Sequence, residues 1–174
     1  RFYDHAILID SISKRYSLCG ARIGFIVSKN SEFIETCLKF ALTRLSPPTL
    51  ALIAANEALN SDKNYIKNVI TEYSNRRKVL ITELSKLQDI KYSDPMGAFY
   101  SIIKLPVKDA EEFAKFLLTD FSVNNESVMV SPASGFYSSK DNGHDEIRIA
   151  FVLNSDKLKR AINIINLGLK EFTS

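Results

Sequence analysis

Two short apolar runs near the start of the chain are typical of buried β-strands: AILID at 6–10 and ARIGFIVS at 21–28. The connection between them is too short for a long crossover helix. The two strands are therefore either antiparallel neighbours or separated members of a larger sheet. Two strands alone do not make a stable sheet, so we expect most of this sheet to lie outside the sequence.

Apolar residues at helical spacing predict three helices after these strands. Ser31 can cap a helix that runs to about Arg44, where the paired prolines of SPPT end it. The segment LALIAANEAL is apolar nearly all round, which predicts a buried helix. A longer helix over 63–87 keeps apolar positions three and four residues apart and is long enough to bridge two domains.

From Ile90 onward the pattern is that of a small domain that mixes strands and helices. The strand-like segments are IKYSDP, AFYSIIKL, SVMVSP and EIRIAFVL. The amphipathic helices are DAEEFAKFLLTDF and the segment 155–172. Together they predict a small α+β sandwich, in which helices cover one side of a sheet.

Composition and charge exclude several classes of partner. The 174 residues are 45% hydrophobic and 25% charged, which is ordinary for a globular protein. The net charge of +3 is too small to favour nucleic acid or a membrane surface as a partner. No apolar run approaches the roughly 20 residues of a membrane span, and no signal-peptide pattern opens the chain. We therefore expect a cytoplasmic protein.

The cysteines and histidines do not predict a metal site. Structural zinc sites bring their ligands in closely spaced pairs, whereas Cys19, Cys37, His5 and His144 are scattered along the chain. We expect no metal and two reduced, mostly packed cysteines.

The segment DSISKRYSLCGARIGF, which joins the two predicted strands, concentrates polar chemistry. Partial burial and the positive charges of Arg15 and Arg22 would favour a neutral Lys14 amine, which can form an imine with an aldehyde. Arg22 offers a planar fork of donors for a phosphate, and Ser11 and Ser13 add hydroxyls. These groups suit a phosphorylated aldehyde, but the pattern alone favours the more common alternative of a solvated loop lysine and a surface arginine at the end of a strand.

This segment resembles the pyridoxal-phosphate attachment motif of class I/II aminotransferases, Ser-x-Ser-Lys-x-(Phe/Tyr)-(Ser/Gly)-x-x-Gly-x-Arg-(hydrophobic)-Gly, and every fixed position matches. Three later segments resemble further marks of the family in the same order: PMGAFYSIIKL, VMVSPASGFY and GHDEIRIAF. The resemblance covers essentially the whole chain and leans towards the aspartate-aminotransferase-like branch. One departure is Pro132-Ala133, where the family has Pro-Gly.

The resemblance implies roles for four residues of the first segment and pyridoxal 5'-phosphate as the cofactor. Lys14 would join covalently to the cofactor's aldehyde and would carry a proton between Cα of the amino acid and the cofactor. Ser11, Ser13 and Arg22 would hold the cofactor phosphate.

Near the carboxyl end, the resemblance implies that Arg148 binds the α-carboxylate of the substrate with two parallel hydrogen bonds, a geometry that lysine does not offer. The alternative is a strand arginine paired with Asp145 or Glu146. Tyr16 could border the pocket, although packing is an equal alternative for an aromatic residue there.

The resemblance also implies the fold and its division. Residues 1–62 would be the last strands of the large, cofactor-binding α/β domain, 63–88 a connecting helix and 89–174 the small α+β domain. In this family the reactive lysine lies well past the middle of the chain, and only thirteen residues precede Lys14 here. We therefore expect a carboxyl-terminal piece of a homodimeric enzyme, with little or no activity alone.

The implied activity is amino-group transfer from an amino acid to a 2-oxo acid by a two-stage, ping-pong mechanism. One alternative keeps the cofactor and breaks another bond, which gives a β-lyase or a decarboxylase. Another is a non-catalytic, ligand-binding domain of a regulator. The presence of Lys14, Arg22 and Arg148 together favours catalysis.

Overall fold

Helices and strands follow one another nearly as the sequence predicts. The computed structural model describes residues 3–174, apart from the side chain of Lys63. In chain order the elements are β1 (Ile7–Ser11), α1 (Ile12–Arg15), η1 (Cys19–Ala21), β2 (Gly24–Ser28), α2 (Ser31–Leu42), α3 (Thr49–Leu59), α4 (Lys63–Leu84), β3 (Lys91–Tyr92), β4 (Tyr100–Lys104), α5 (Ala110–Thr119), β5 (Ser131–Pro132), η2 (Ser134–Phe136), β6 (Glu146–Ala150) and α6 (Ser155–Phe172).

These elements form two compact units, which we call unit 1 (Arg1–Asn68) and unit 2 (Val69–Ser174). The helix α4 begins in unit 1 and continues into unit 2. The functional division at 1–62, 63–88 and 89–174 stays a prediction. None of the helices among the described residues is both long and apolar enough to cross a membrane.

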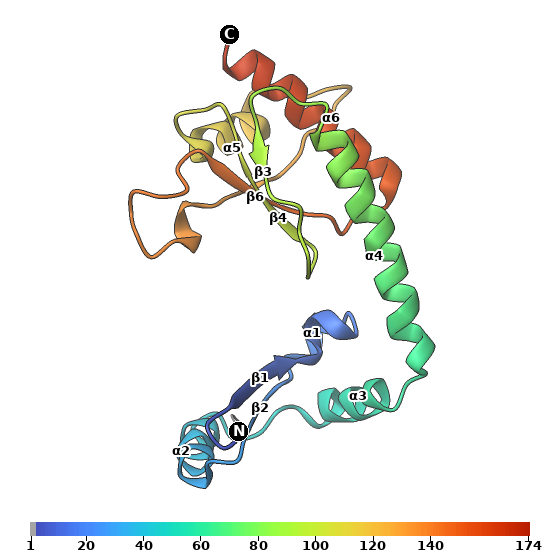
Figure 1. Cartoon of the computed structure of the whole chain (residues 1–174), viewed down its shortest axis with the longest axis vertical. Coiled ribbons are helices and arrows are strands. Elements are labelled where there is room, and N and C mark those ends of the chain that lie inside the picture. Colours follow the sequence, from blue (N-terminus) through green and yellow to red (C-terminus); the bar gives the residue numbers. More distant parts are fainter. Residues whose placement is uncertain (1–2) are drawn as a thin grey trace. The chain divides into compact units, whose positions relative to one another are not determined.

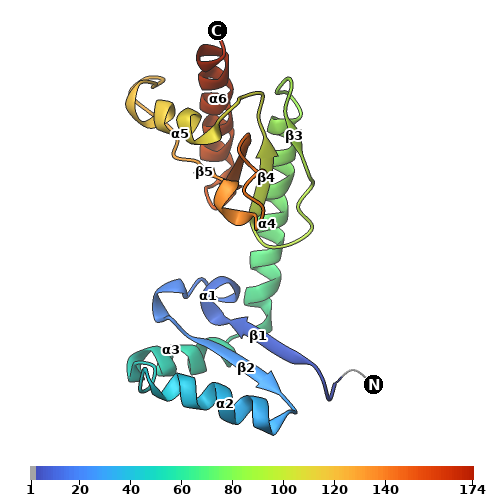
Figure 2. The same cartoon turned by 90° about the vertical axis from the view of Figure 1, so that its left-hand side faces the viewer.

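In unit 1, β1 and β2 form an antiparallel hairpin, which decides between the two arrangements that the sequence allowed. Its register runs from Ile7 opposite Ser28 to Ser11 opposite Gly24. Glycine permits the close approach at that end, because a Cβ at position 24 would lie 3.3 Å from the carbonyl oxygen of Asp10. The loop 12–23, which contains α1 and η1, is therefore held at one end of the hairpin (Figure 2).

The expected burial of the unit 1 strands and of the alanine-rich helix is wrong for the described residues. Leu8 and Ile9 of β1 are 56% and 72% exposed. In α3 only Ala55 is buried, and Leu50 is 81% exposed. The helices α2 and α3 run along one side of the hairpin (Figure 2), and two strands with these helices leave too little protein to cover both faces.

Several helix boundaries differ from the prediction by one to three residues, and two of them have a clear cause. The cap of α2 is Asn30 and not Ser31: the Asn30 Oδ1 accepts a hydrogen bond of 3.0 Å from the N–H of Phe33. Asn30 has extended backbone angles, so Ser31 becomes the first helical residue. The long helix α4 ends at Leu84, because tighter turn hydrogen bonds, including Leu87 N–H to the Leu84 carbonyl, replace the helical pattern.

In unit 2, four strands form an antiparallel sheet in the order β3-β4-β6-β5. Figure 1 labels β3, β4 and β6, and Figure 2 labels β5. Alternate residues of the two central strands are buried on one face. The core on that face contains Leu80 and Leu84 of α4, Phe113 and Leu117 of α5, Ile103 and Ile147 of the sheet, and Leu158, Ile162, Ile165 and Leu169 of α6. Helices thus cover one face of the sheet, and the predicted α+β sandwich is confirmed.

The predicted strand at 127–132 is shorter in the structure. Within this stretch, Ser131–Pro132 (β5) is the part that pairs with β6. The preceding residues keep the alternation of a strand, since Val128 and Val130 pack against the core while Met129 is 81% exposed. Side-chain packing therefore positions this stretch without ladder hydrogen bonds.

Substitution of two adjacent leucines on α5 tests the location of the core. Leu117 is fully buried and Leu118 is 58% exposed. We expect Leu117→Ala to lower the free energy of unfolding by about 2–5 kcal/mol, because it leaves a cavity. The matched control, Leu118→Ala, should cost about 0.5 kcal/mol or less. Urea unfolding of the chain, followed by circular dichroism, measures both, and equal losses would contradict this core.

Candidate functional site

The predicted site residues of unit 1 gather at the closed end of the hairpin. Lys14 belongs to α1, which directly follows β1, and Arg22 lies between η1 and β2. The pairing of Ser11 with Gly24 brings the two ends of the loop together. Strand pairing, and not sequence neighbourhood alone, therefore places Lys14 and Arg22 in the same small loop.

The hydroxyl of Ser11 orders the start of this loop. Its Oγ accepts a hydrogen bond of 3.0 Å from the N–H of Ser13 and so caps α1. Both serines are half-buried. The cap uses a lone pair of Ser11, so the hydroxyl hydrogen is left to donate to an anion.

Arg22 has an unusual backbone for a residue with a side chain. Its φ of 55° and ψ of 39° lie in the left-handed region, where a residue other than glycine costs about 1–3 kcal/mol. Its Nη1 donates a hydrogen bond of 2.9 Å to the carbonyl oxygen of Cys19. This bond fastens the guanidinium to its own turn while leaving further N–H donors for an anion.

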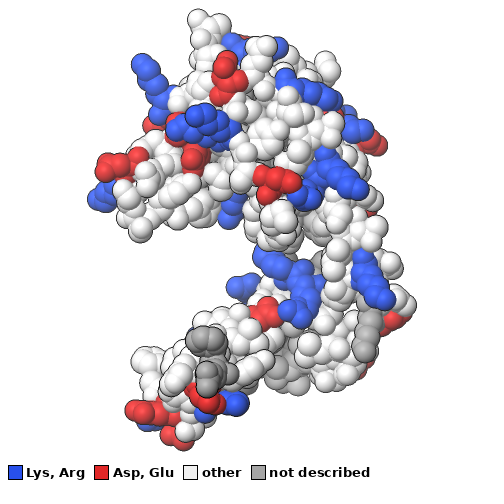
Figure 3. All heavy atoms as spheres, viewed as in Figure 1, with Lys and Arg blue, Asp and Glu red and all other residues white. Residues whose placement is uncertain are grey.

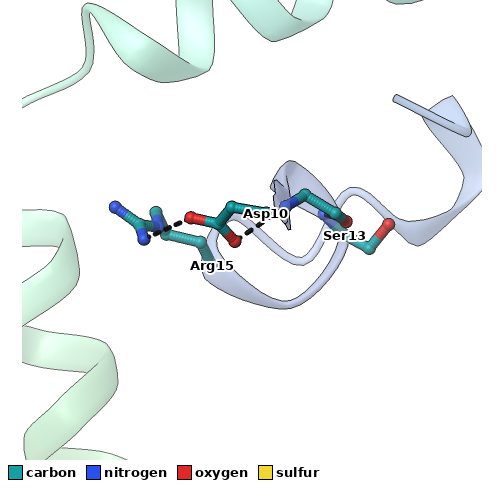
Figure 4. Close-up of polar contacts among 4 residues, drawn as sticks. Asp10, Ser13 and Arg15 are labelled. Atoms are coloured by element: carbon teal, nitrogen blue, oxygen red, sulfur yellow. Dashed lines mark hydrogen bonds and ion pairs between the residues drawn. The ribbon is translucent and has the colours of Figure 1, made fainter. Parts of the chain in front are cut away.

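The charges around Lys14 differ from those expected. Asp10, which the sequence analysis gave no role, accepts from Arg15 Nη2 at 2.7 Å and from the N–H of Ser11 at 2.7 Å (Figure 4). The charge of Arg15 is therefore neutralised within the loop. Lys14 and Arg22 are exposed, so the expected partial burial of the amine is wrong for the described residues. In Figure 3, Lys and Arg side chains gather over α1.

Tyr16 serves packing in this structure. Its ring stacks on Tyr65 at the start of α4, with ring centroids 6.2 Å apart and planes inclined by 13°. The contact joins the loop to the helix within unit 1.

Arg148 lies on β6 in unit 2, on the face of the sheet that points away from the core. The alternative in which it pairs with a neighbouring acid is not observed. Asp145 instead forms an ion pair with Lys104 at 2.6 Å, and Glu146 accepts a hydrogen bond from the hydroxyl of Tyr137. Among the described residues, no carboxylate forms an ion pair with Arg148.

Two aromatic rings contact Arg148 instead. Its Cζ lies 4.6 Å from the ring centroid of Tyr100 and 4.5 Å from that of Phe136. Sequence reasoning missed both rings. Their only signal is the pair of aromatic residues in AFYSIIKL and GFY, and pattern alone does not bring these segments to the same arginine.

Comparison with known proteins gives the family. The model of the family described as aminotransferase class I and II matches residues 2–165. The chain belongs to this family.

Its relatives share sequence along nearly the whole chain. An aspartate aminotransferase of Pyrococcus horikoshii is 29% identical over 96% of the chain. A (5-formylfuran-3-yl)methyl phosphate transaminase of Methanocaldococcus jannaschii is 32% identical over 97%. The chain spans 42% of the length of each of these two relatives.

Solved structures agree with the fold. An aromatic aminotransferase from Pyrococcus horikoshii is similar with a TM-score of 0.81 and 26% identity, over 98% of this chain and 44% of that one. A structure from Methanococcus jannaschii, described as similar in its active site to kynurenine aminotransferases, has a TM-score of 0.76 and 30% identity, over 97% and 42%.

The one departure from the aminotransferase motif fits the structure without strain. Ala133, where the motif has glycine, has a φ of −101°, which any residue adopts. It is fully buried, and its N–H donates to the carbonyl oxygen of Glu146 at 2.9 Å. Alanine therefore supports the turn that leads to Phe136.

Metal ligands do not converge in the part of the chain that the structure describes. Within residues 3–174, no three side chains of His, Cys, Asp or Glu are grouped to hold an ion. Cys37 is half-buried, but Cys19 is an exposed free thiol, which corrects the expectation that both are packed.

The hydrogen bond from the Tyr137 hydroxyl to Glu146 can be tested by titration of Tyr137. The bond to Glu146, with smaller effects of burial and charge, raises the pKa of Tyr137 above 10.0. We expect the pKa of Tyr137 to fall towards 10.0 in Glu146→Gln, because the carboxylate that favours the protonated phenol is gone. NMR of 13C-labelled tyrosine rings follows the titration, with Tyr92 as the internal control. An unchanged pKa of Tyr137 would contradict the contact.

Proposed function

We propose that this chain supplies the reactive lysine and the substrate-carboxylate site of a pyridoxal-phosphate-dependent aminotransferase, which moves an amino group from an amino acid to a 2-oxo acid. The observation that carries the proposal is the hairpin end that brings Lys14 and Arg22 into one loop, in a chain of the aminotransferase family. Because the chain spans 42% of its relatives, we propose that it works as part of a longer protein.

The donors of the loop fit the proposed cofactor. A phosphorylated aldehyde needs an amine for its carbonyl carbon and cationic or hydroxyl donors for its phosphate. Lys14 provides the amine, and Arg22 provides the guanidinium on a turn that its own bond to Cys19 orders. Ser11 and Ser13, one of them already fixed as the cap of α1, would add hydroxyl donors.

Pyridoxal phosphate, when bound, supplies an electron-accepting ring next to the substrate. Lys14 would hold the cofactor through its Nζ, with the aldehyde oxygen leaving as water. As a free amine, the same Nζ would take the proton that leaves the substrate Cα. Arg22 and the serines keep the phosphate in place during this exchange. Arg148 binds the α-carboxylate of the substrate through the planar fork of its guanidinium.

The proposal does not specify which amino acid is the substrate. It also concerns the whole protein. The relatives are named for different substrates, among them aspartate, LL-diaminopimelate and a furan phosphate, which supports the reaction class rather than one substrate. We propose that the whole enzyme is a cytoplasmic homodimer. The exposed apolar residues Leu8, Ile9 and Leu50 support further protein over unit 1.

Borohydride trapping tests the reactive lysine. After addition of pyridoxal phosphate and reduction, we expect the phosphopyridoxyl mass mainly at Lys14, because Arg22 and the serines hold the phosphate beside it. Peptide mass spectrometry locates the label. Lys39→Ala, which removes another exposed lysine of unit 1, should leave the labelling of Lys14 unchanged, and Arg22→Gln should lower it about tenfold or more. Equal labelling of all lysines would contradict the site.

Turnover tests the need for a longer protein. We expect the 174-residue chain alone to show little or no transamination of amino acids with 2-oxoglutarate, measured by product chromatography. The full-length protein should be active, and its Lys14→Ala variant should not. Robust turnover by the chain alone would overturn the proposal that it works as a part, and release of a β-lyase or decarboxylase product would overturn the reaction class.

A further inference from the structure

The rings of Tyr100 and Phe136 contact Arg148 of β6, and they come from segments on opposite sides of that strand. Tyr100 begins β4, in which Ile102 lies opposite Arg148. Phe136 ends η2, which follows β5, in which Ser131 lies opposite Arg148. Since β4 and β5 flank β6 in the sheet, the two rings reach the arginine from opposite sides of its strand.

Aromatic contacts restrain an arginine in a way that ion pairs do not. A guanidinium is planar, stacks on ring faces and makes its strong hydrogen bonds along its edge, in its own plane. Rings within 4.6 Å of Cζ therefore limit rotation of that plane while leaving the edge open to a carboxylate. A neighbouring Asp or Glu would orient Arg148 but would also occupy that edge and neutralise its charge.

The structure keeps both neighbouring acids away from this edge. Asp145 is held by Lys104, with the bond raising the pKa of the lysine, and Glu146 is held by Tyr137. Arg148 is thus oriented by neutral rings, and its charge remains for an external anion.

We propose that Tyr100 and Phe136 are positioning residues, which fix the plane of the Arg148 guanidinium so that it can bind the α-carboxylate with two parallel hydrogen bonds. The inference rests on the proposed function. Burial alone does not explain Phe136, because it is 54% exposed and lies outside the hydrophobic core. Phe99, next to Tyr100 in the chain, packs against that core instead.

Kinetics of the full-length enzyme test the role. In Phe136→Leu and in Tyr100→Leu we expect the KM for the amino acid to rise about two- to fivefold, and in the double variant about four- to twenty-five-fold. The kcat should stay within about twofold, because the reacting atoms are not touched. Phe136→Tyr and Tyr100→Phe keep the rings and should keep the KM. Leu118→Ala, at a side chain of unit 2 that is 58% exposed, is the control.

Binding supplies a readout that does not depend on turnover. Calorimetry of the holoenzyme with butanoate and with its neutral analogue butanamide separates carboxylate recognition from general damage to the pocket. In the ring variants the affinity for butanoate should fall by the factors given above, while the affinity for butanamide stays the same. Equal losses for both ligands, or no loss for butanoate, would overturn the positioning role. Thermal melting identifies any variant that fails to fold. If a leucine variant fails, Phe136→Tyr and Tyr100→Phe still test the positioning role, because they keep the rings.

Arg148→Gln separates this inference from the proposed function. If Arg148 binds the α-carboxylate, this change should raise the KM by about thirtyfold or more. A large effect of Arg148→Gln with none in the ring variants would overturn the positioning role alone. An unchanged KM in Arg148→Gln would remove the carboxylate role of Arg148 and the inference with it.

Discussion

The pairing of β1 with β2 is the constraint on which the candidate site depends. Its register ends with Ser11 opposite Gly24, and that contact closes the loop that carries Lys14 and Arg22. A slip of one residue would turn every strand side chain to the other face and would separate the cap of α1 from the turn at Arg22. Gly24 has no Cβ, so its backbone can lie close to the carbonyl oxygen of Asp10 in this register.

Unit 2 positions its arginine by the same kind of constraint. Ile147 and Ile149 bury their side chains in the core, and the alternation of the strand then turns Arg148 to the other face. The hydrophobic core thus decides where the cation lies, and the strands on either side of β6 decide which rings it meets.

Local periodicity was enough to predict much of the fold. The helix Ser155–Phe172 has the predicted bounds, because apolar spacing and a capping residue, Asn154, are adjacent in sequence. The motif around Lys14 could likewise be found from its spacing. Features that depend on distant partners could not, among them the rings at Arg148 and the short ladder at Ser131. The exposure of Leu8 and Ile9 could not be predicted either, because the burial of a strand depends on what packs against it.

The left-handed backbone of Arg22 sets two demands on one position. Glycine would relax the turn but would remove the cation, whereas lysine would keep a charge without the planar fork and would still carry the backbone cost. If Arg22 holds the phosphate, as we propose, few amino acids can satisfy both demands, and substitutions here would trade folding against ligand affinity. In directed evolution, a gain in thermal stability at this codon would then be a warning of lost activity.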